Sequence, residues 1–501
     1  MSKGRKLVKG SALRVVDFFA NAIIGLILMP FIVRSLGDKM YGLWIFVGSF
    51  IGYYGLFDLG LDSAVQRYIS RALSLKDYND VNRVVNTALF IFIIIGLISL
   101  TCTFVIVPAV PLLIKRISEV KTFQAILLIL GLNFSITFPM RIFSGILSAN
   151  IRYDLNTAVS ILKLCVRTVL VVIFLKLGYG IMALTVITFA VNIMDYSIKY
   201  FIVKKLYKYI LISRKFIDKS KIKLLFNYSL FTFIAQLADD LRFKIDNLVI
   251  VFFLGLNPVT LYSIAARLAM YFMQLVSATM GLLRPVFSQF EAKNDYVAIR
   301  EKLIFTTKIS SYLSIFIGGS LIVFGKAFIY RWMGKGYIDA YLILIILVVP
   351  LIIALMQQPT VQLLYGISKH KLFAIANMME GVTNLILSII LVRKFGLIGV
   401  ALGTAIPMVI VKLFIQPIYA CRAIKLSIRK YYFELIVLPI LKSLTVFMFT
   451  FLLLKNFIVP DYSRLFILVL AQMVLFPCII FFIGFNNEEQ GRFKQLIFRT
   501  N

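Results

Sequence analysis

The chain has 501 residues, of which 61% are hydrophobic and only 15% are charged. Soluble domains average about 45–50% apolar and about 25% charged residues, so this composition excludes an ordinary soluble protein and predicts an integral membrane protein. The formal net charge is +32, yet the lysines and arginines lie in short segments between apolar runs. We therefore exclude nucleic acid as a partner and expect the basic segments to meet anionic lipid head groups.

The sequence offers few motifs for catalysis or for binding metals or nucleotides. The four cysteines each lie inside an apolar run, and the single histidine, His370, stands between two lysines. This pattern offers no disulfide framework, metal site or catalytic triad. The sequence also has no G-x-x-x-x-G-K-[ST] motif for binding a nucleotide. We expect no catalytic residue, no metal and no cofactor, and hence a protein that is not an enzyme.

Apolar runs of helical length follow one another along the whole chain. They predict an all-α, polytopic membrane protein of about fourteen transmembrane helices, each near the length that a bilayer requires. The expected spans are 13–33, 42–61, 84–109, 123–149, 156–176, 180–200, 224–254, 260–283, 303–324, 341–365, 372–392, 397–419, 433–454 and 464–484.

The basic segments orient these spans. Lysine and arginine concentrate at both ends of the chain and in the loops after every second span, most densely over residues 199–223. By the positive-inside rule, these loops and both termini lie in the cytoplasm.

Short motifs recur between the two halves of the chain. Leu36-Gly37 corresponds to Leu254-Gly255, and Lys176-x-Gly178 to Lys394-x-Gly396, with the same offset of 218 residues. The recurrence predicts two six-span lobes in the same orientation, an arrangement in which transporters bind substrate between the halves and alternate access. The expected parts are an N-terminal lobe (1–200), a basic cytoplasmic linker (201–223), a C-terminal lobe (224–420), and two additional spans with a cytoplasmic tail (421–501).

The segment from Lys223 to Gly255 reads as one helix about 45 Å long, which exceeds the roughly 30 Å of a bilayer core. Charged residues stand near its centre and enter the membrane with it. Such groups are costly and normally face a wet cavity or a partner helix. Alternatively, they neutralise one another and only orient the helix. They are Asp239, Asp240, Arg242, Lys244 and Asp246.

The fifth span carries a second polar face. Asn156, Ser160, Lys163 and Arg167 recur at helical spacing on one side of an otherwise apolar helix. Lys163 and, in the eighth span, Arg267 lie about seven residues from the nearer helix end, roughly 10 Å deep. Embedded cations of this kind suit an anionic head group, and phosphate is the anion that arginine binds best.

Three other cations, Arg284, Lys308 and Lys412, stand close to the ends of expected helices. Long basic side chains in such places reach the interface without a function. We therefore expect these three to snorkel.

Two motifs near the start of the chain are Leu36-Gly37 … Tyr41-Gly42-x-Trp44 and Phe57-Asp58-Leu59-Gly60-Leu61-x-x-Ala64-x-x-Arg67-Tyr68. They resemble the Wzx-type oligosaccharide-lipid flippases of the multidrug/oligosaccharidyl-lipid/polysaccharide exporter superfamily. The resemblance implies a V-shaped, two-lobed helical bundle in the cell inner (cytoplasmic) membrane. It also implies that an undecaprenyl-pyrophosphate-linked oligosaccharide repeat unit crosses that membrane, for the O-antigen of lipopolysaccharide, capsular or related polysaccharide biosynthesis.

With such a substrate, a pyrophosphate needs cations in a water-filled central cavity, and sugars need polar or aromatic side chains. The candidates for pyrophosphate binding are Arg141, Lys163, Arg167 and Arg267. The candidates for sugar binding are Asn156, Asn377 and Asn384, with Tyr53 and Tyr54.

Because the chain has no ATP-binding motif, the drive must come from an ion gradient, the membrane potential or consumption of the product. The candidates for ion or proton coupling are Asp17, Asp239, Asp240, Asp246 and Glu380. Asp58 of the motif suits a structural role beside the Gly60 turn at least as well as a role in transport. Expected partners are the lipid-linked oligosaccharide, anionic lipids and polysaccharide polymerase or export proteins.

Three other functions stay open. A cation-coupled multidrug or metabolite exporter of the same superfamily would favour carboxylates in its first lobe, where this chain has cations. A non-transporting scaffold for polysaccharide synthesis would use the basic linker but has no need of charges deep in the membrane. A peptidoglycan precursor flippase would move a closely related lipid-linked substrate.

Overall fold

The computed structural model describes residues 3–113, 119–454 and 462–491. Over these ranges the chain forms helices and turns and no strand. Ten stretches of the described chain are long and apolar enough to cross a membrane, or eleven if the bent pair α12 (Ala340–Met356) and α13 (Gln358–Gly366) counts as one span. The predicted polytopic all-α membrane protein is confirmed. The number of about fourteen spans stays a prediction.

The chain divides into two compact units. Unit 1 comprises Met1–Asp240 and Ile250–Thr260, and unit 2 comprises Leu241–Val249 and Leu261–Asn501. The boundaries predicted for the two lobes, the linker and the additional spans stay predictions. Residues 492–501 of the predicted tail lie outside the described residues.

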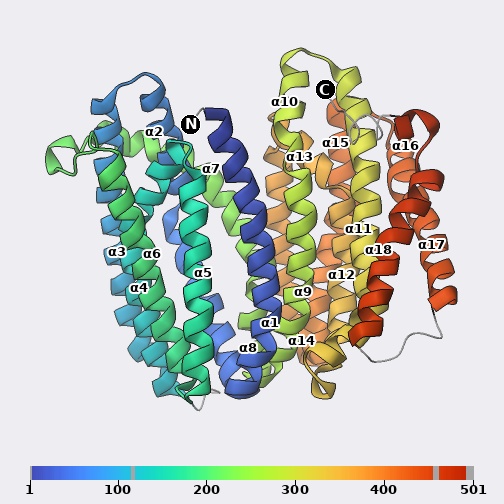
Figure 1. Cartoon of the computed structure of the whole chain (residues 1–501), viewed down its shortest axis with the longest axis horizontal. Coiled ribbons are helices and arrows are strands. Elements are labelled where there is room, and N and C mark those ends of the chain that lie inside the picture. The colour runs from blue at the N-terminus through green and yellow to red at the C-terminus, as the bar shows by residue number, and fades with distance from the viewer. Residues whose placement is uncertain (1–2, 114–118, 455–461, 492–501) are drawn as a thin grey trace. The chain divides into compact units, whose positions relative to one another are not determined.

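Unit 1 is built from long helices joined by short turns (Figure 1). They are α1 (Lys3–Gly52), η1 (Tyr53–Asp58), α2 (Leu61–Ser74), α3 (Tyr78–Leu113), α4 (Val120–Ala149), α5 (Tyr153–Lys176), α6 (Gly180–Leu206), η2 (Arg214–Phe216) and most of α7 (Lys219–Phe243). Helix α4 packs against α3 and α6, and α5 packs against α6 and α1. Apolar side chains of α2, α3 and α4 form a buried core that includes Phe92 and Phe138. This packing places the polar faces of α4, α5 and α6 beside one another.

The segment after α6 is tied to α3 by two side-chain amides. Asn82 donates to the carbonyl of Tyr209 at 2.9 Å and accepts from the backbone amide of Leu211 at 2.8 Å. Asn86 donates to the carbonyl of Leu211 at 2.7 Å and accepts from the backbone amide of Ser213 at 2.8 Å. Asn82 and Asn86 are spaced i,i+4 on α3. Their side-chain amides pair with backbone N–H and C=O groups of the extended segment, as a neighbouring β-strand would. This part of the predicted linker is therefore bound to unit 1.

Unit 2 continues the helical chain around a long helix, α11 (Tyr296–Trp332) (Figure 1). Its other elements are part of α8 (Ile245–Leu254), most of α9 (Asn257–Met280), α10 (Leu283–Ala292), η3 (Lys335–Tyr337), α12, α13, α14 (Lys371–Ile410), η4 (Val411–Ile415), α15 (Gln416–Ile424), α16 (Ile428–Tyr432), η5 (Phe433–Val437), α17 (Leu438–Leu454) and α18 (Tyr462–Gly484). Helix α11 packs against α12, α13, α17 and α18. Phe287, Met356 and Tyr431 belong to the buried core beside it.

The prediction of one continuous helix over Lys223–Gly255 is wrong. Helix α7 ends at Phe243 and α8 begins at Ile245, so the helix breaks within its charged stretch. The backbone carbonyl of Arg242, at the break, accepts a hydrogen bond from Nδ2 of Asn384 at 3.1 Å. A break at membrane depth requires partners for the freed backbone groups, and broken helices are typical of ion and substrate sites in transporters.

Glycines of the repeated motifs share one backbone feature. The φ angle is 74° at Gly37 and 94° at the corresponding Gly255, and 85° at Gly178 and 56° at the corresponding Gly396. Glycine adopts this left-handed region without the strain that a Cβ would bring. Gly37 interrupts α1 and Gly396 interrupts α14, so the recurring motifs mark recurring breaks and turns.

Candidate functional site

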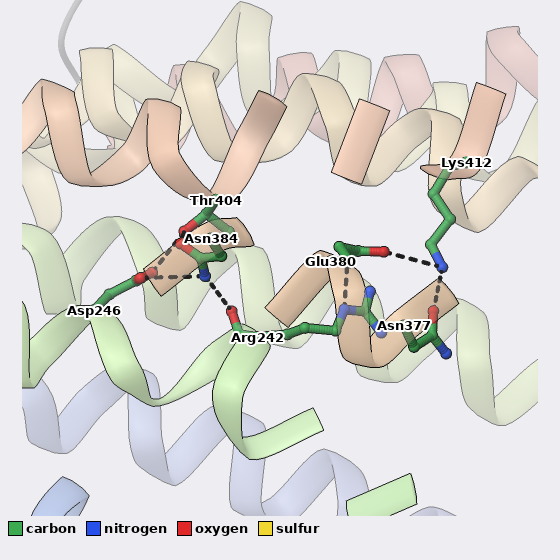
Figure 2. A network of polar contacts seen from close by, with 7 residues as sticks. All are labelled: Arg242, Asp246, Asn377, Glu380, Asn384, Thr404 and Lys412. Carbon is green, nitrogen blue, oxygen red and sulfur yellow. Dashed lines mark hydrogen bonds and ion pairs between the residues drawn. The ribbon is translucent and has the colours of Figure 1, made fainter. Parts of the chain in front are cut away.

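Unit 2 contains a buried network of polar side chains, which Figure 2 shows from close by. The residues come from the break between α7 and α8, from both halves of α14, and from η4. Each is less than a tenth exposed. In chain order they are Arg242, Asp246, Asn377, Glu380, Asn384, Thr404 and Lys412.

Glu380 bridges two cations at one end of this network. Its Oε1 accepts from Nε of Arg242 at 2.7 Å, and its Oε2 lies 3.4 Å from Nζ of Lys412. Lys412 also donates to Oδ1 of Asn377 at 2.9 Å. With Glu380 only 2% exposed, this is a buried charge-paired group in which each charged member depends on the others.

Asp246 forms the other end of the network. Its carboxylate accepts from the hydroxyl of Tyr262 at 2.5 Å, from Oγ1 of Thr404 at 2.9 Å and from Nδ2 of Asn384 at 3.5 Å. All three donors are neutral, and Asp246 is only 4% exposed. A buried carboxylate held by neutral donors is suited to binding a proton or a cation, because either one offsets the cost of its charge.

Helix α14 positions most of these groups. Asn377, Glu380, Asn384 and Ser388 follow one another at i, i+3, i+7 and i+11 and therefore share one face. The second half of α14 packs closely on the first, since a Cβ at Gly403 would lie 2.2 Å from Oγ of Ser388. Such an approach is open only to glycine.

Unit 1 brings a cation of α5 close to a buried ion pair on α6. Lys199 and Asp195, one helical turn apart on α6, are buried and paired at 3.0 Å. Lys163 on α5 lies within electrostatic reach of both, and of Arg167 on its own helix. Lys163 therefore has two cations and one carboxylate, already paired, as charged neighbours. Lys199, counted above with the basic loop residues, lies within α6, and its cytoplasmic location stays a prediction.

Arg141 on α4 pairs with two carboxylates. Its Nη1 lies 3.6 Å from Oδ1 of Asp58 and 3.4 Å from Oδ2 of Asp62. The motif residue Asp58 is thus tied to the fourth helix through a guanidinium that was a candidate for pyrophosphate binding.

The four predicted pyrophosphate ligands are divided between the units. Arg141, Lys163 and Arg167 belong to unit 1, and Arg267 belongs to α9 in unit 2, where it hydrogen-bonds Tyr271. A single site made by all four stays a prediction.

The predicted sugar ligands have partners within their own units. Asn156 donates to the carbonyl of Ser144 at 3.1 Å and to Oγ of Ser148 at 2.9 Å, so both its amide hydrogens hold α5 against α4. Asn377 and Asn384 belong to the unit 2 network. The hydroxyl of Tyr54 pairs with Oγ1 of Thr103 at 3.1 Å. Sugar binding by these residues, and by Tyr53, stays a prediction.

Of the predicted coupling residues, Asp246 and Glu380 lie together in the unit 2 network. Asp17 in α1 accepts from Nδ2 of Asn21 at 3.1 Å. Asp240, in the last turn of α7, is buried, and the side chain of Asp239 lies outside the described residues.

The expectation that Lys412 snorkels is wrong. Its side chain is 5% exposed and turns inward to Glu380, Asn377 and the ring of Phe373, 4.9 Å from the ring centroid. Lys308 pairs with Glu489 at 2.6 Å, and the guanidinium of Arg284 lies 4.4 Å from the ring centroid of Tyr365.

Sequence reasoning missed several members of both clusters. The opposite charges of Asp195 and Lys199 at i,i+4 inside an apolar run were a usable signal. Tyr262 and Thr404 carry no such local signal, because the partner that they share, Asp246, comes from a different helix.

The chain is similar in sequence to proteins of polysaccharide biosynthesis. The family described as "Polysaccharide biosynthesis protein" matches residues 7–291, which is more than half of the chain. The chain is 20% identical to a putative O-antigen transporter of Shigella flexneri over 421 residues, 82% of this chain and 97% of the relative. It is 21% identical to the uncharacterized membrane protein EpsK of Bacillus subtilis (strain 168) over 415 residues, 81% of each protein. A probable low-salt glycan biosynthesis flippase of Haloferax volcanii, Agl15, is 28% identical over 182 residues, 36% of this chain and 39% of the relative.

Solved transporter structures share the fold. An inward-facing multidrug resistance MATE family transporter of the MOP superfamily has a TM-score of 0.71 at 18% identity, covering 85% of this chain and 99% of that one. The lipid II flippase MurJ in its inward closed conformation has a TM-score of 0.70 at 18% identity, covering 97% of this chain and 100% of that one. At such identities the likeness establishes the fold alone. The family match covers most of unit 1 and extends into unit 2, and the chain belongs to the polysaccharide biosynthesis protein family.

Proposed function

We propose that the protein is a flippase that moves an undecaprenyl-pyrophosphate-linked oligosaccharide repeat unit across the inner membrane, for O-antigen, capsular or related polysaccharide. Family membership supports this proposal, as do the relatives named as an O-antigen transporter and a glycan biosynthesis flippase. Flipping breaks no bond in the substrate, so the activity needs no catalytic residue.

The position of Lys163 is the observation that carries the proposal: this cation of α5 lies within electrostatic reach of Arg167 and of the buried pair that Asp195 and Lys199 form on α6. The one carboxylate near Lys163, Asp195, is already paired with Lys199. A pyrophosphate brings several negative charges and strong acceptor oxygens, which would pair with Lys163 through charge-assisted hydrogen bonds. The polyprenyl chain needs no such site, because it is as apolar as the bilayer.

Coupling to an ion gradient is the second part of the proposal. Asp246 is the preferred coupling residue, because its buried carboxylate is held by neutral donors beside a broken helix. Binding and release of a proton or cation there would change the charge of the unit 2 network. Alternating access would then be driven by the difference in ion occupancy between the two states.

A flipping assay tests the role of the cations. The full chain is reconstituted in liposomes, and the transfer of a labelled lipid-linked oligosaccharide between leaflets is measured for the parent, Lys163→Ala and Arg167→Ala. Each charge-assisted contact contributes about 1.5–3 kcal/mol, so we expect each variant to flip about tenfold more slowly or worse. Lys176→Ala, an exposed cation at the end of the same helix, serves as the matched control and is expected to flip normally.

Two outcomes of this assay would contradict the proposal. Equal rates for all four proteins would mean that the cations are structural. A parent that moves a peptidoglycan precursor or a cationic drug, but not the lipid-linked repeat unit, would replace the proposed function with one of its rivals.

A gradient experiment tests Asp246. Flipping by the parent is expected to slow when the proton or cation gradient is dissipated, whereas Asp246→Asn is expected to bind substrate normally and to ignore the gradient. Asp339→Asn, which neutralises an exposed carboxylate before α12, is the control. If Asp246→Asn still responds to the gradient, coupling lies elsewhere.

A further inference from the structure

Unit 1 holds two carboxylates that have no role in the proposed function. Asp58 at the end of η1 and Asp62 on α2 both reach Nη1 of Arg141, at 3.6 and 3.4 Å. Two anions thus share one guanidinium nitrogen. If both are ionised, the cluster carries one negative charge that its cation does not balance.

Burial makes that extra charge costly at Asp58. Its side chain is 6% exposed, against 27% for Arg141 and 49% for Asp62. Oδ1 of Asp58 is buried and accepts no hydrogen bond from the part of the chain that the structure describes, and its contact with Arg141 is an ion pair at 3.6 Å. A buried carboxylate oxygen in this situation lacks the donor that would offset its desolvation. A proton at this position removes the charge.

The groups around the pair leave Arg141 as the charged partner. Tyr196 on α6 lies within electrostatic reach of Arg141 and Asp62. Backbone amides of Gly60 and Asp62 donate to the carboxylate of Asp58, which stabilises its charged form but still leaves Oδ1 without a donor among the described residues. Among the described residues, Arg141 is the cation that faces both carboxylates.

Carboxylates and phosphates compete for a guanidinium. Both present paired oxygens to its planar edge, and phosphate is the stronger ligand. If a phosphate of the substrate binds Arg141, it displaces Asp58 and Asp62 from their counter-ion. Loss of a neighbouring positive charge favours the neutral, protonated form of a carboxylate.

We propose that Asp58 and Asp62 form a proton-binding site and that their carboxylates compete with a substrate phosphate for Arg141. Protonation of the pair frees the guanidinium for the anion, and binding of the anion draws a proton from water onto a carboxylate oxygen. The ion pair between carboxylate and guanidinium is replaced by one between phosphate and guanidinium. The identity of the anion rests on the proposed function, whereas the proton exchange applies to any phosphate that reaches Arg141.

Proton uptake on anion binding tests the proposal directly. The full chain in lipid nanodiscs, in weakly buffered solution with a pH indicator, is titrated with inorganic pyrophosphate and, separately, with undecaprenyl pyrophosphate. We expect the parent to take up as much as about one proton per anion bound. Affinity should therefore rise by up to about tenfold for each pH unit lowered, which is the limit that linkage sets for one proton.

Three variants assign the proton. Asp58→Asn with Asp62→Asn keeps the shapes of both side chains and is expected to bind pyrophosphate at least as tightly as the parent, without pH dependence or proton uptake. Arg141→Gln is expected to weaken binding and to abolish uptake. The matched control is Asp154→Asn, which alters a buried carboxylate paired with Arg152 at 3.0 Å and is expected to leave uptake unchanged. The double variant also provides the baseline for protons exchanged by pyrophosphate itself.

An infrared difference spectrum on adding pyrophosphate gives a second readout if the double variant folds poorly. The parent should gain the C=O band of a protonated carboxyl group, and the single variants Asp58→Asn and Asp62→Asn should show which residue carries it. Lack of both the band and the uptake, or pH-dependent binding that persists in the double variant, would overturn the exchange. Lipid binding without uptake would overturn the exchange and leave the flippase standing. Uptake with inorganic pyrophosphate but not with the lipid would support the exchange and count against the proposed substrate.

Discussion

Unit 1 and unit 2 bury their charges in different ways. In unit 2, Arg242 and Lys412 share Glu380, and Asp246 is surrounded by neutral donors, so positive and negative groups balance at two each. In unit 1, Lys163 of α5 lies near two other cations and near a carboxylate, Asp195, that is already paired with Lys199. The cations of the unit 2 network thus share a carboxylate, whereas Lys163 lies beside a carboxylate that another lysine already pairs with.

This difference predicts that substitutions affect folding stability in unit 2 and ligand binding in unit 1. Removal of one member of a balanced buried network leaves its partners unpaired, and the loss falls on folding. Removal of Lys163, which lies near two other cations, leaves fewer like charges together, and the loss falls on the ligand. The two units should therefore respond in opposite ways to the same kind of substitution.

Glu380→Gln is expected to have the largest effect. The substitution keeps the size of the side chain but leaves Arg242 and Lys412 buried beside a neutral amide. Breaking a buried ion pair in this way costs about 3–5 kcal/mol. Unfolding of the purified protein, followed by temperature or denaturant, measures the loss. Asp339→Asn removes one exposed carboxylate from the same unit and should unfold like the parent. A stable Glu380→Gln protein would mean that the pairing with Glu380 does not limit the stability of unit 2.

Asn384→Ala is expected to have an intermediate effect, focused on the break between α7 and α8. The amide group donates to the carbonyl of Arg242 and accepts from Ser388 and Thr404. Each buried polar group left without a partner costs about 1–3 kcal/mol. Hydrogen exchange should accelerate over residues 241–250 and stay slow in α11. Uniform acceleration throughout unit 2 would instead assign Asn384 a global role in packing.

The break at Lys244 also shows what the sequence reveals and what it does not. Runs of apolar residues predicted a polytopic helical protein, because the length of a span is a local property. The shared face of Asn377, Glu380 and Asn384 likewise follows from helical spacing alone. The break itself depends on an amide from α14 that is 142 residues away from Arg242 in the chain. A local sequence pattern does not reveal a partner that is so far away along the chain.

The expectation for Lys412 was wrong for a physical reason. Lys412 stands near the end of an expected span, where a lysine normally reaches the interface. Its side chain is instead buried against Glu380, a residue of α14. Exposure was inferred from position in the sequence, but a buried counter-ion decides which way a long basic side chain turns.

Lys163→Gln is expected to have the smallest effect on folding and so gives the sharpest test of the comparison. It removes one attraction, to Asp195, and two repulsions, from Arg167 and Lys199. These changes oppose one another, so the free energy of unfolding should change by less than about 0.5 kcal/mol. Affinity for undecaprenyl pyrophosphate should nevertheless fall about tenfold, because one charge-assisted contact is lost. Lys176→Gln on the same helix should alter neither quantity. If Lys163→Gln destabilises the protein as much as Glu380→Gln does, Lys163 belongs to a network that stabilises the fold, as Glu380 does in unit 2. Lys163 would then not be a cation that is available to bind a phosphate.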